Sequence, residues 1–296
     1  MALITLITSG QVLAEPARDP ELILLRNELA VCGVRCAFAD WVAASELSAS
    51  DLVIIKSPWD YAYRSVEFLG WLGRAESQTR VLNPPEVIRW NLDKRYLGEL
   101  ADRGVPVCPT TFCGDLDEVR AAIDACSGRV VVKPTVSASS ADTGLFQPDD
   151  PAALALARRI VGGGKQVMVQ PAVDSVATAG ERSLIYLAGE FAHAVGRAPV
   201  LALGGGLRAV REPAVLVDPE PAELAMACRI LAAASELMAA RGVREPFLHA
   251  RVDLVRGDDG RPLLLELELF EPSLFLHLAP GAGRRYAEAL MARLEA

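Results

Sequence analysis

Apolar residues are concentrated in short runs over the first eighty positions, and segments with helical spacing lie between these runs. Residues 2–8, 34–39 and 51–56 are short, mostly apolar runs of the kind that form buried strands. Residues 20–31 and 65–75 place apolar side chains three and four positions apart, which predicts amphipathic helices. Strands that alternate with helices predict an α/β domain built on a doubly wound parallel sheet, with ligands bound beyond the carboxyl ends of its strands.

Beyond Asn83-Pro84-Pro85, which reads as a joint, strands and helices follow one another in a different order. The pattern predicts a compact α+β unit and then a unit with a long helix and a terminal hairpin. We expect an N-terminal domain at 1–90, a central unit at 91–172 and a C-terminal unit at 173–296. The expected strands cover 105–112, 129–133, 166–170, 182–188, 190–196, 247–255 and 262–269, and the expected helices cover 93–103, 116–125, 152–161, 223–241 and 283–294.

Composition argues against several classes of protein. The chain has 296 residues and a formal net charge of -8, which disfavours a nucleic-acid partner because phosphate backbones bind basic surfaces. No apolar run approaches the roughly 18 residues of a membrane helix, and the amino terminus carries no basic leader. The 6 cysteines show no two-residue spacing, so we expect reduced thiols in a cytoplasm. With 3 histidines, a zinc site built on several histidines is hard to assemble.

The strongest chemical signal lies in the terminal hairpin. Side chains alternate between faces along a strand, so Arg251 and Asp253 share one face, and the hairpin brings Glu266 and Glu268 beside them. Three carboxylates that converge in this way suit Mg²⁺, which binds carboxylates together with substrate phosphates. The residues between them are apolar and are expected to face the core: Val252, Leu254, Leu265 and Leu267.

A solvated acidic hairpin is the alternative interpretation of this segment. It accounts well for Asp258 and Asp259, which lie in the predicted turn. It accounts poorly for Glu266 and Glu268, because the run 262–270 is otherwise apolar. The pattern therefore favours a metal site.

A second signal is the lysine that ends the apolar strand Val130-Val-Val-Lys133. A lysine in this position is costly to bury without an anionic partner. The loop after it consists of small residues, including Ser139 and Ser140, so backbone N–H groups and hydroxyls can approach phosphate oxygens. A surface lysine beside a flexible serine loop is the alternative, and the glycine-rich Walker A pattern is missing.

Three further positions are weak signals when each is taken alone. Lys94 lies near the start of a predicted helix, where a solvated lysine is the ordinary interpretation. The segment from Gln170 to Val173 ends a strand and offers backbone groups to a purine. Glu181 follows it and is able to hold ribose hydroxyls.

Taken in order, these segments resemble the ATP-grasp superfamily, in particular the branch with glutathione synthetase and D-alanine–D-alanine ligase. The resemblance runs from about 83 to 275. Lys133-Pro134 precedes Ser139-Ser140, as in the D-alanine ligases. Arg251-x-Asp253 precedes Glu266-x-Glu268, with the family's spacing from the aspartate to the first glutamate.

Two departures from the family pattern stand out. Glu268 replaces the asparagine of many members and adds negative charge, so a metal pair should bind at least as readily. Ala138 and Asp142 replace loop glycines, so the phosphate contacts are expected to differ in detail from those of the family.

The resemblance implies a reaction and a role for each site residue. The family uses ATP to activate a carboxylate as an acyl phosphate and joins that carbon to a nitrogen, while a lid keeps water away. The implied ATP contacts are Lys94, Lys133, Ser139, Gln170, Val173 and Glu181. The implied ligands of a pair of Mg²⁺ ions are Asp253, Glu266 and Glu268. The implied catalytic residues are Arg197, toward the γ-phosphate, Arg251, on the carboxylate or the tetrahedral intermediate, and Ser140.

A narrower resemblance rests on the phrases at 57–61, 180–184 and 265–273. They are similar to a subgroup of bacterial ATP-grasp ligases that includes D-cycloserine synthetase. This implies an amino-acid-like substrate, O-ureido-D-serine, that is phosphorylated and then closed into a ring. An intermolecular amide or dipeptide ligase is the other interpretation. The candidate residues of the substrate pocket are Trp59, Asp60, Tyr61 and Glu271, and core packing is the alternative for the two aromatic side chains.

Two classes other than a ligase fit the sequence less well. A nucleotide-binding module without catalysis would lack part of the constellation, yet Lys133, Arg251 and the three carboxylates are all present. A dinucleotide-dependent oxidoreductase would carry a Gly-x-Gly-x-x-Gly fingerprint after its first strand, and residues 9–14 do not supply it.

Overall fold

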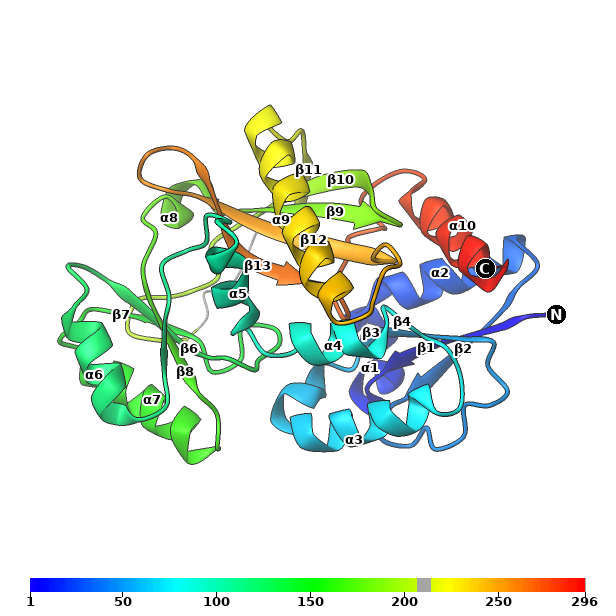
Figure 1. Ribbon diagram of the computed structural model, residues 1–296, viewed down its shortest axis with the longest axis horizontal. Helices are drawn as coiled ribbons and strands as arrows, with labels where there is room; N and C mark the ends of the chain where they lie inside the picture. Colours follow the sequence, from blue (N-terminus) through cyan, green and yellow to red (C-terminus); the bar gives the residue numbers. More distant parts are fainter. Residues whose placement is uncertain (207–213, 296) are drawn as a thin grey trace.

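A computed structural model describes residues 1–206 and 214–295 and contains three sheets (Figure 1). The first sheet is parallel, with the strand order β2-β1-β3-β4. This parallel arrangement, with helices in the connections, is the α/β architecture expected from the sequence. The strands are β1 (Leu3–Thr8), β2 (Arg35–Asp40), β3 (Leu52–Ser57) and β4 (Val81–Leu82).

Helices cover both faces of this sheet because alternate residues of its strands point to opposite sides. Ile54 lies in one apolar core with the helices α2 (Pro20–Val31) and α10 (Ala282–Glu295). Its neighbour Ile55 lies in the other core with α3 (Ser65–Glu76). The shorter elements of this part are α1 (Gly10–Ala14), η1 (Pro16–Arg18) and η2 (Trp59–Tyr63).

The second sheet is antiparallel, with the order β5-β8-β6-β7, and lies at the left of Figure 1. Two helices pack on it, and together they bury a separate small apolar core. The strands are β5 (Thr111–Cys113), β6 (Val130–Pro134), β7 (Gly144–Phe146) and β8 (Val167–Pro171), and the helices are α6 (Leu116–Asp124) and α7 (Pro151–Gly162).

The third sheet is also antiparallel, with the order β11-β10-β9-β12-β13. The long helix α9 (Pro221–Ala240) packs on it with α4 (Pro85–Asn91) and α5 (Tyr96–Asp102). The strands are β9 (Glu181–Leu187), β10 (Glu190–Arg197), β11 (Val215–Val217), β12 (His249–Arg256) and β13 (Pro262–Glu268), and α8 (Val176–Ala179) precedes β9. None of the helices in the described ranges is long and apolar enough to cross a membrane.

Each sheet falls within one of the three expected units, but three helices pack elsewhere. α4 and α5 belong to the core of the third sheet, and α10 packs against α2 of the first unit. We keep the division at residues 90 and 172 as a proposal for the course of the chain, and these three helices cross it.

Two expected elements differ from the structure for reasons that involve proline. Pro85 opens α4 instead of serving as a joint, because its fixed φ and missing N–H suit the first position of a helix. The strand expected over 105–112 is reduced to β5. Pro106 and Pro109 interrupt this stretch, and only a single bridge joins Val107 to Leu264.

A β-bulge corrects the expected orientation of Leu265. Asp253 pairs with Glu266, but the next residue, Leu254, pairs with Leu264, so Leu265 is the extra residue of the hairpin. Leu264 is fully buried in its place, and Leu265 lines the central cavity. The expectation that Leu265 faces the core is wrong, because strict alternation holds only up to the bulge.

The segment between α4 and α5 is attached to the free edge of β13. The amide of Asn91 donates to the carbonyl of Leu267 at 2.8 Å and accepts from the N–H of Leu269 at 2.7 Å. The hydroxyl of Tyr96 accepts from the N–H of Leu267 at 2.9 Å. These bonds satisfy backbone groups of an edge strand and fix the position of Lys94, which lies between the two side chains in the sequence.

A buried ion pair joins the first sheet to the segment that follows β13. Lys56 Nζ lies 2.6 Å from Glu21 Oε2, and both side chains are almost fully buried. Lys56 also donates to the carbonyl of Pro272 at 3.3 Å. Burial alone would lower the pKa of Lys56, but the carboxylate of Glu21 raises it above its usual value, so the lysine stays charged.

We predict that Glu21→Gln destabilises the fold by about 3–5 kcal/mol, because Lys56 would be left charged and buried without its partner. Urea unfolding measures the change. Glu15→Gln is the matched control: it breaks an exposed pair with Arg18 and should change the free energy of unfolding by no more than about 1 kcal/mol. Equal losses in the two variants would contradict the structural role of the buried pair.

Candidate active site

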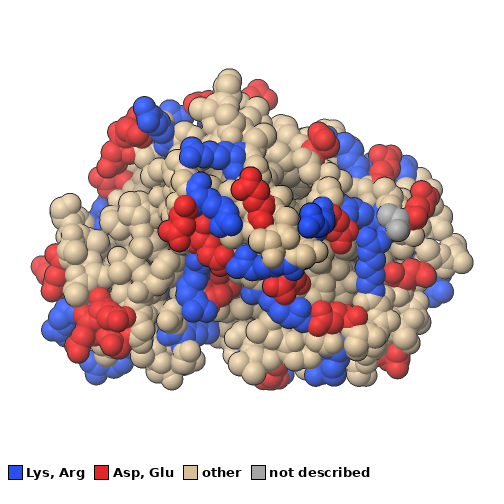
Figure 2. Space-filling model, viewed as in Figure 1, with Lys and Arg blue, Asp and Glu red and all other residues tan. Residues whose placement is uncertain are grey.

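A cavity of about 360 Å³ is lined by residues of the second and third sheets and by the η2 turn of the first unit. Residues of β6 and β8 line one side, and residues of β12 and β13 line another. The η2 turn and the segment after β13 close one end with Trp59, Tyr61 and Glu271. Figure 2 shows that charged side chains of both signs intermingle over the middle of one face of the molecule.

The terminal hairpin brings the predicted acidic residues together. Arg251 pairs across the strands with Glu268, and Asp253 pairs with Glu266. On the other side of β12, Asp253 pairs with Ser183 of β9, whose hydroxyl donates to Asp253 Oδ1 at 2.6 Å. The predicted convergence of three carboxylates on one face of the sheet is therefore present.

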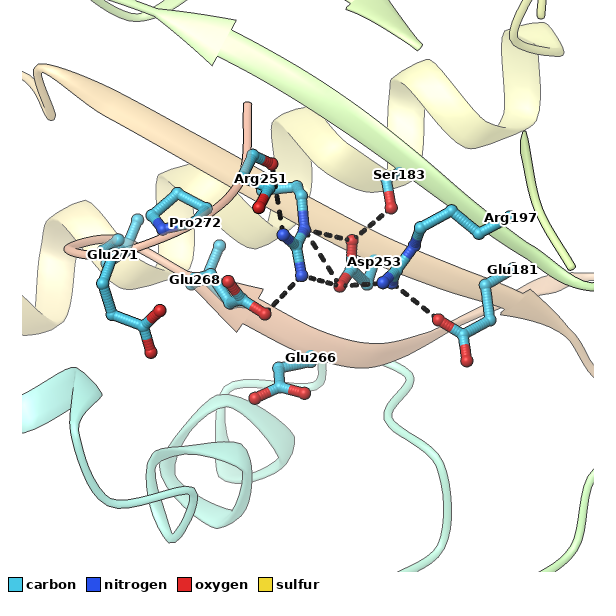
Figure 3. Close-up of polar contacts among 12 residues, drawn as sticks. Glu181, Ser183, Arg197, Arg251, Asp253, Glu266, Glu268, Glu271 and Pro272 are labelled. Atoms are coloured by element: carbon cyan, nitrogen blue, oxygen red, sulfur yellow. Dashed lines mark hydrogen bonds and ion pairs between the residues drawn. The ribbon is translucent and has the colours of Figure 1, made fainter. Parts of the chain in front are cut away.

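Arginine side chains occupy the space between these carboxylates (Figure 3). Arg251 donates to the two oxygens of Asp253 from Nε and Nη2, each at 2.9 Å, and its Nη2 also donates to Glu268. Arg197 Nη2 donates to Asp253 Oδ2 at 2.7 Å and to Glu181 Oε2 at 2.6 Å. Two guanidinium groups thus offset much of the negative charge of Asp253, Glu268 and Glu181.

The carboxylates differ in their proton affinity. Burial alone would raise the pKa of Asp253, but Arg197 and Arg251 hold it below its usual range. Burial raises the pKa of Glu268 to about 8, with Glu266 adding to the effect and Arg251 opposing it. The side chain of Asp253 is 2% exposed and that of Glu268 is 21% exposed, so Glu268 is open to exchange its partner for a ligand.

Lys94 is part of the site and not a solvated helix lysine. Its Nζ lies 2.9 Å from Glu266 Oε1 and donates to the carbonyl of Ser137 at 3.0 Å, and its side chain is only 8% exposed. Burial alone would raise the pKa of Glu266, but Lys94 and then Lys133 lower it. This pair connects the hairpin to the loop after β6.

Lys133 ends β6 and lines the same cavity, so the alternative of a surface lysine is excluded. Within the described ranges, no hydrogen bond or ion pair engages its ammonium group. Burial is the main reason that the pKa of Lys133 is lowered, and Lys94 adds to the effect. An anionic ligand would relieve both effects, which makes Lys133 a suitable contact for phosphate.

The loop after Lys133 carries its serines into the cavity wall. Ser139 and Ser140 have φ of 52° and 57°, in the left-handed region that favours glycine. Asp142 has φ of 52° as well, so this residue keeps the backbone shape of a glycine-rich loop. Such a conformation directs backbone N–H groups toward one side, as anion-binding loops require.

The opposite end of the cavity contains the residues expected to bind adenosine. Gln170 and Val173 line it, and the amide of Gln170 donates to the hydroxyl of Thr110 at 2.8 Å. Glu181 also lines this part and keeps a raised pKa because it is buried.

Three of the four candidate residues for a substrate pocket reach the cavity. Trp59 and Tyr61 line it, although Tyr61 also packs against Phe68 and Phe270, so the packing alternative holds in part. Glu271 lines the same end. Asp60 does not reach it: its carboxylate accepts a hydrogen bond from the indole of Trp41 at 2.8 Å. Asp60 therefore serves the turn instead of the pocket.

Sequence reasoning missed Ser183 and Ser137, which support the charged groups. Ser183 is fully buried between residues of the β9 core and holds Asp253. A polar residue at a core position of an otherwise apolar strand was the available signal. Ser137 contacts Lys94 mainly through its carbonyl group, a contact that residue type does not reveal.

The predicted metal ligands are not preorganised as a cage. No group of three acidic, histidine or cysteine side chains in residues 1–206 and 214–295 is arranged to hold a metal ion. Each predicted carboxylate instead contacts a cationic side chain, Lys94 or an arginine. These contacts show that the centre requires positive charge, and the hard oxygen donors fit Mg²⁺, which takes few protein ligands beside substrate phosphates.

Solved structures with the same fold define the class. D-alanyl-alanine synthetase A from Vibrio cholerae O1 biovar eltor str. N16961 superposes with a TM-score of 0.67 at 16% identity over 99% of this chain and 97% of that one. The ATP-grasp ligase PsnB, solved with its minimal precursor, Mg and ADP, gives a TM-score of 0.62 at 17% identity over 99% and 98% of the two chains. The architecture is that of the ATP-grasp ligases.

Sequence comparison narrows the class to a family. The cycloserine biosynthesis protein DcsG of Streptomyces lavendulae is 35% identical over the whole of both chains. The crystal structure of D-cycloserine synthetase DcsG gives a TM-score of 0.90 at 34% identity, over 99% of this chain and 100% of that one. The family model for the N-terminal domain of D-cycloserine synthetase DcsG matches residues 4–83. The chain belongs to the DcsG family of ATP-grasp ligases, and it is an ATP-dependent ligase.

We predict that Lys133→Ala weakens ATP binding about 10- to 100-fold, the range expected for loss of a charge-assisted hydrogen bond in a buried site. Titration calorimetry with ATP measures the change. Arg120→Ala, an exposed arginine on α6 of the same unit, is the control and should bind ATP like the wild type. Unchanged ATP binding by the Lys133 variant would remove this lysine from the nucleotide site.

Proposed function

We propose that this enzyme uses ATP to close O-ureido-D-serine into D-cycloserine. The observation that carries the proposal is the full-length similarity to DcsG, together with a cavity that holds nucleotide-type and carboxylate-type groups side by side. The substrate is a small amino acid with a carboxylate to activate and an internal nitrogen to attack it. The net charge of -8 fits such a partner better than a nucleic acid.

ATP lies along the cavity in this proposal. Gln170, Val173 and Glu181 hold the adenosine end, and Lys94, Lys133 and Ser139 contact the phosphates. Support comes from the location of all six residues in the wall of one cavity. Lys133 lines the same cavity as Ser139 and Ser140 of the serine loop, as phosphate binding by these groups requires.

Asp253, Glu266 and Glu268 would hold Mg²⁺, and we propose that they hold a pair of ions. When bound, the metal neutralises charge on the transferred phosphoryl group. Arg197 and Arg251, which contact these carboxylates, would then be available to the phosphoryl group and the substrate. The extra carboxylate of Glu268 supports this assignment, since burial and the neighbouring carboxylates raise its pKa, and a bound cation would relieve this unfavourable charge.

Arg251, Arg197 and Ser140 act on the reacting groups. Arg197 lies beside Glu181 and Asp253, so it is placed between the nucleotide end and the metal ligands and reaches the γ-phosphate. Arg251 lies deeper, between Asp253 and the carbonyl of Ser273, and holds the substrate carboxylate. Ser140 belongs to the loop that covers the phosphates.

The chemistry follows from this placement. The substrate carboxylate accepts the γ-phosphoryl group and becomes an acyl phosphate. The nitrogen attached to the side-chain oxygen then attacks the acyl carbon and gives up its proton, and phosphate leaves. After the ring has closed, water cleaves the bond from this nitrogen to the carbamoyl carbon, which releases carbamate and leaves a proton on the ring nitrogen. Water must be excluded while the acyl phosphate exists, and the second sheet supplies the cover as a lid. Free thiols at all 6 cysteines support a cytoplasmic location.

The proposal is tested by ADP release with Mg-ATP, with and without O-ureido-D-serine, followed by mass analysis of the product. ADP that forms only with this substrate, alongside a cyclised product, is expected. The absence of stimulation would exclude the cycloserine reaction, and amino acids paired with amines would then test an intermolecular ligase.

We predict that Glu268→Gln lowers turnover at least about tenfold and raises the Mg²⁺ concentration needed for half-maximal activity, because one anionic ligand is lost. Circular dichroism should show an intact fold. Asp258→Asn, in the exposed turn of the same hairpin, is the control and should behave as the wild type. Wild-type turnover in the Glu268 variant would mean that the hairpin is not the metal site.

A further inference from the structure

Glu271 is a buried carboxylate that the reaction outlined above leaves without a role. It is 8% exposed, follows β13 by three residues and lines the closed end of the cavity. Tyr61 donates its hydroxyl to Glu271 Oε1 at 2.8 Å, and the indole of Trp59 donates to the carbonyl of Glu271 at 3.2 Å. Both aromatic residues belong to η2 of the first unit, so the position of this carboxylate is set from outside its own strand.

The second oxygen of Glu271 has no partner among the described residues. Lys94 and Arg251 both lower the pKa of Glu271, but each is paired with another carboxylate, Lys94 with Glu266 and Arg251 with Asp253 and Glu268. An ionised carboxylate accepts several hydrogen bonds, and Glu271 lines the cavity, so its second oxygen is available to a ligand that donates. Burial raises the pKa of Glu271 to about 7, while Tyr61, Lys94 and Arg251 oppose the rise, so the charge on this carboxylate is only partly compensated.

We infer that Glu271 binds the α-ammonium group of the amino-acid substrate through Oε2, with Tyr61 as the residue that positions it. This inference rests on the proposed function and adds a residue that recognises the amino group of the substrate. An ammonium group is a compact cation with three donors and complements an unpartnered carboxylate.

The location of the carboxylate site supports the same orientation. In an α-amino acid, the ammonium and carboxylate groups are attached to one carbon, so their binding groups must lie near each other. Arg251, which holds the substrate carboxylate, donates to the carbonyl of Ser273 at 3.2 Å, two residues beyond Glu271. Glu271 and the carbonyl group that contacts Arg251 therefore lie in one short segment, which places the ammonium-binding and carboxylate-binding residues near each other.

Two other roles make different demands on the substrate. A carboxylate that accepts the proton of the attacking nitrogen would be needed whether or not the substrate carries an amine. A carboxylate that only anchors η2 through Tyr61 would likewise affect all substrates equally. Only the loss of an ammonium-binding residue would lower kcat/KM for the substrate with the amine and leave kcat/KM for the compound without it unchanged.

The test compares O-ureido-D-serine with its analogue that lacks the amino group, 3-(ureidooxy)propanoic acid. ADP release gives kcat/KM for each compound with the wild type, Glu271→Gln and Tyr61→Phe. We expect Glu271→Gln to lower kcat/KM for the amine-bearing substrate about 10- to 100-fold, as for a lost charge-assisted hydrogen bond. Its kcat/KM for the analogue and its KM for ATP should match those of the wild type.

Tyr61→Phe should act in the same direction but less strongly, through a higher KM for the amine-bearing substrate with kcat retained. Tyr63→Phe, which alters an exposed tyrosine of the same turn, is the matched control and should leave both substrates unaffected. If Glu271→Gln does not fold, Glu271→Asp, which keeps the charge but shortens its reach, is measured by the same ratio.

Equal losses with both compounds would overturn the inference while the proposed function stands. A wild type that releases no ADP with O-ureido-D-serine would overturn the proposed function and this inference together, and that result requires no variant. The two failures are therefore distinguishable.

Discussion

The structure depends on the burial of carboxylates that must be held by cations. Asp253 is almost completely buried, and two guanidinium groups and one hydroxyl satisfy its oxygens. Ion pairs at this depth lose much of their stabilising energy to desolvation, so they are a poor way to gain stability. They do keep charged side chains in place for a ligand, because Mg²⁺ can replace the arginines at the carboxylates and phosphate can replace the carboxylates at the arginines.

The three units meet at this centre because separate segments are tied to the terminal hairpin. Asn91 and Tyr96 bind the backbone of β13, which brings Lys94 to Glu266. Lys165, from the loop before β8, donates to carbonyl groups of the first unit and of the serine loop. A nucleotide between the sheets would therefore contact groups whose positions depend on one another, which explains how a cavity built from three units keeps a defined shape.

The charged residues of the candidate site are easier to predict from the sequence than the residues around them. The carboxylates of the hairpin and Lys133 stood out because each is an expensive residue in an apolar run, and the cost of burial points to a ligand. Leu265 was misplaced because a bulge breaks the alternation that sequence reasoning assumes. Asp60 was misplaced because its partner, Trp41, is distant in the sequence. The pairing of Arg251 with both Asp253 and Glu268 also depends on tertiary packing that no local pattern encodes.

The central claim is that a substrate carboxylate is activated as an acyl phosphate in the cavity between these sheets. The most direct measurement uses O-ureido-D-serine labelled with ¹⁸O in its carboxylate and analyses the phosphate that is released by mass spectrometry. We expect one ¹⁸O atom in each phosphate, because the bond from the acyl carbon to the bridging oxygen breaks when the nitrogen attacks. Phosphate without the label, formed together with product, would show that the carboxylate is not phosphorylated and would contradict the account.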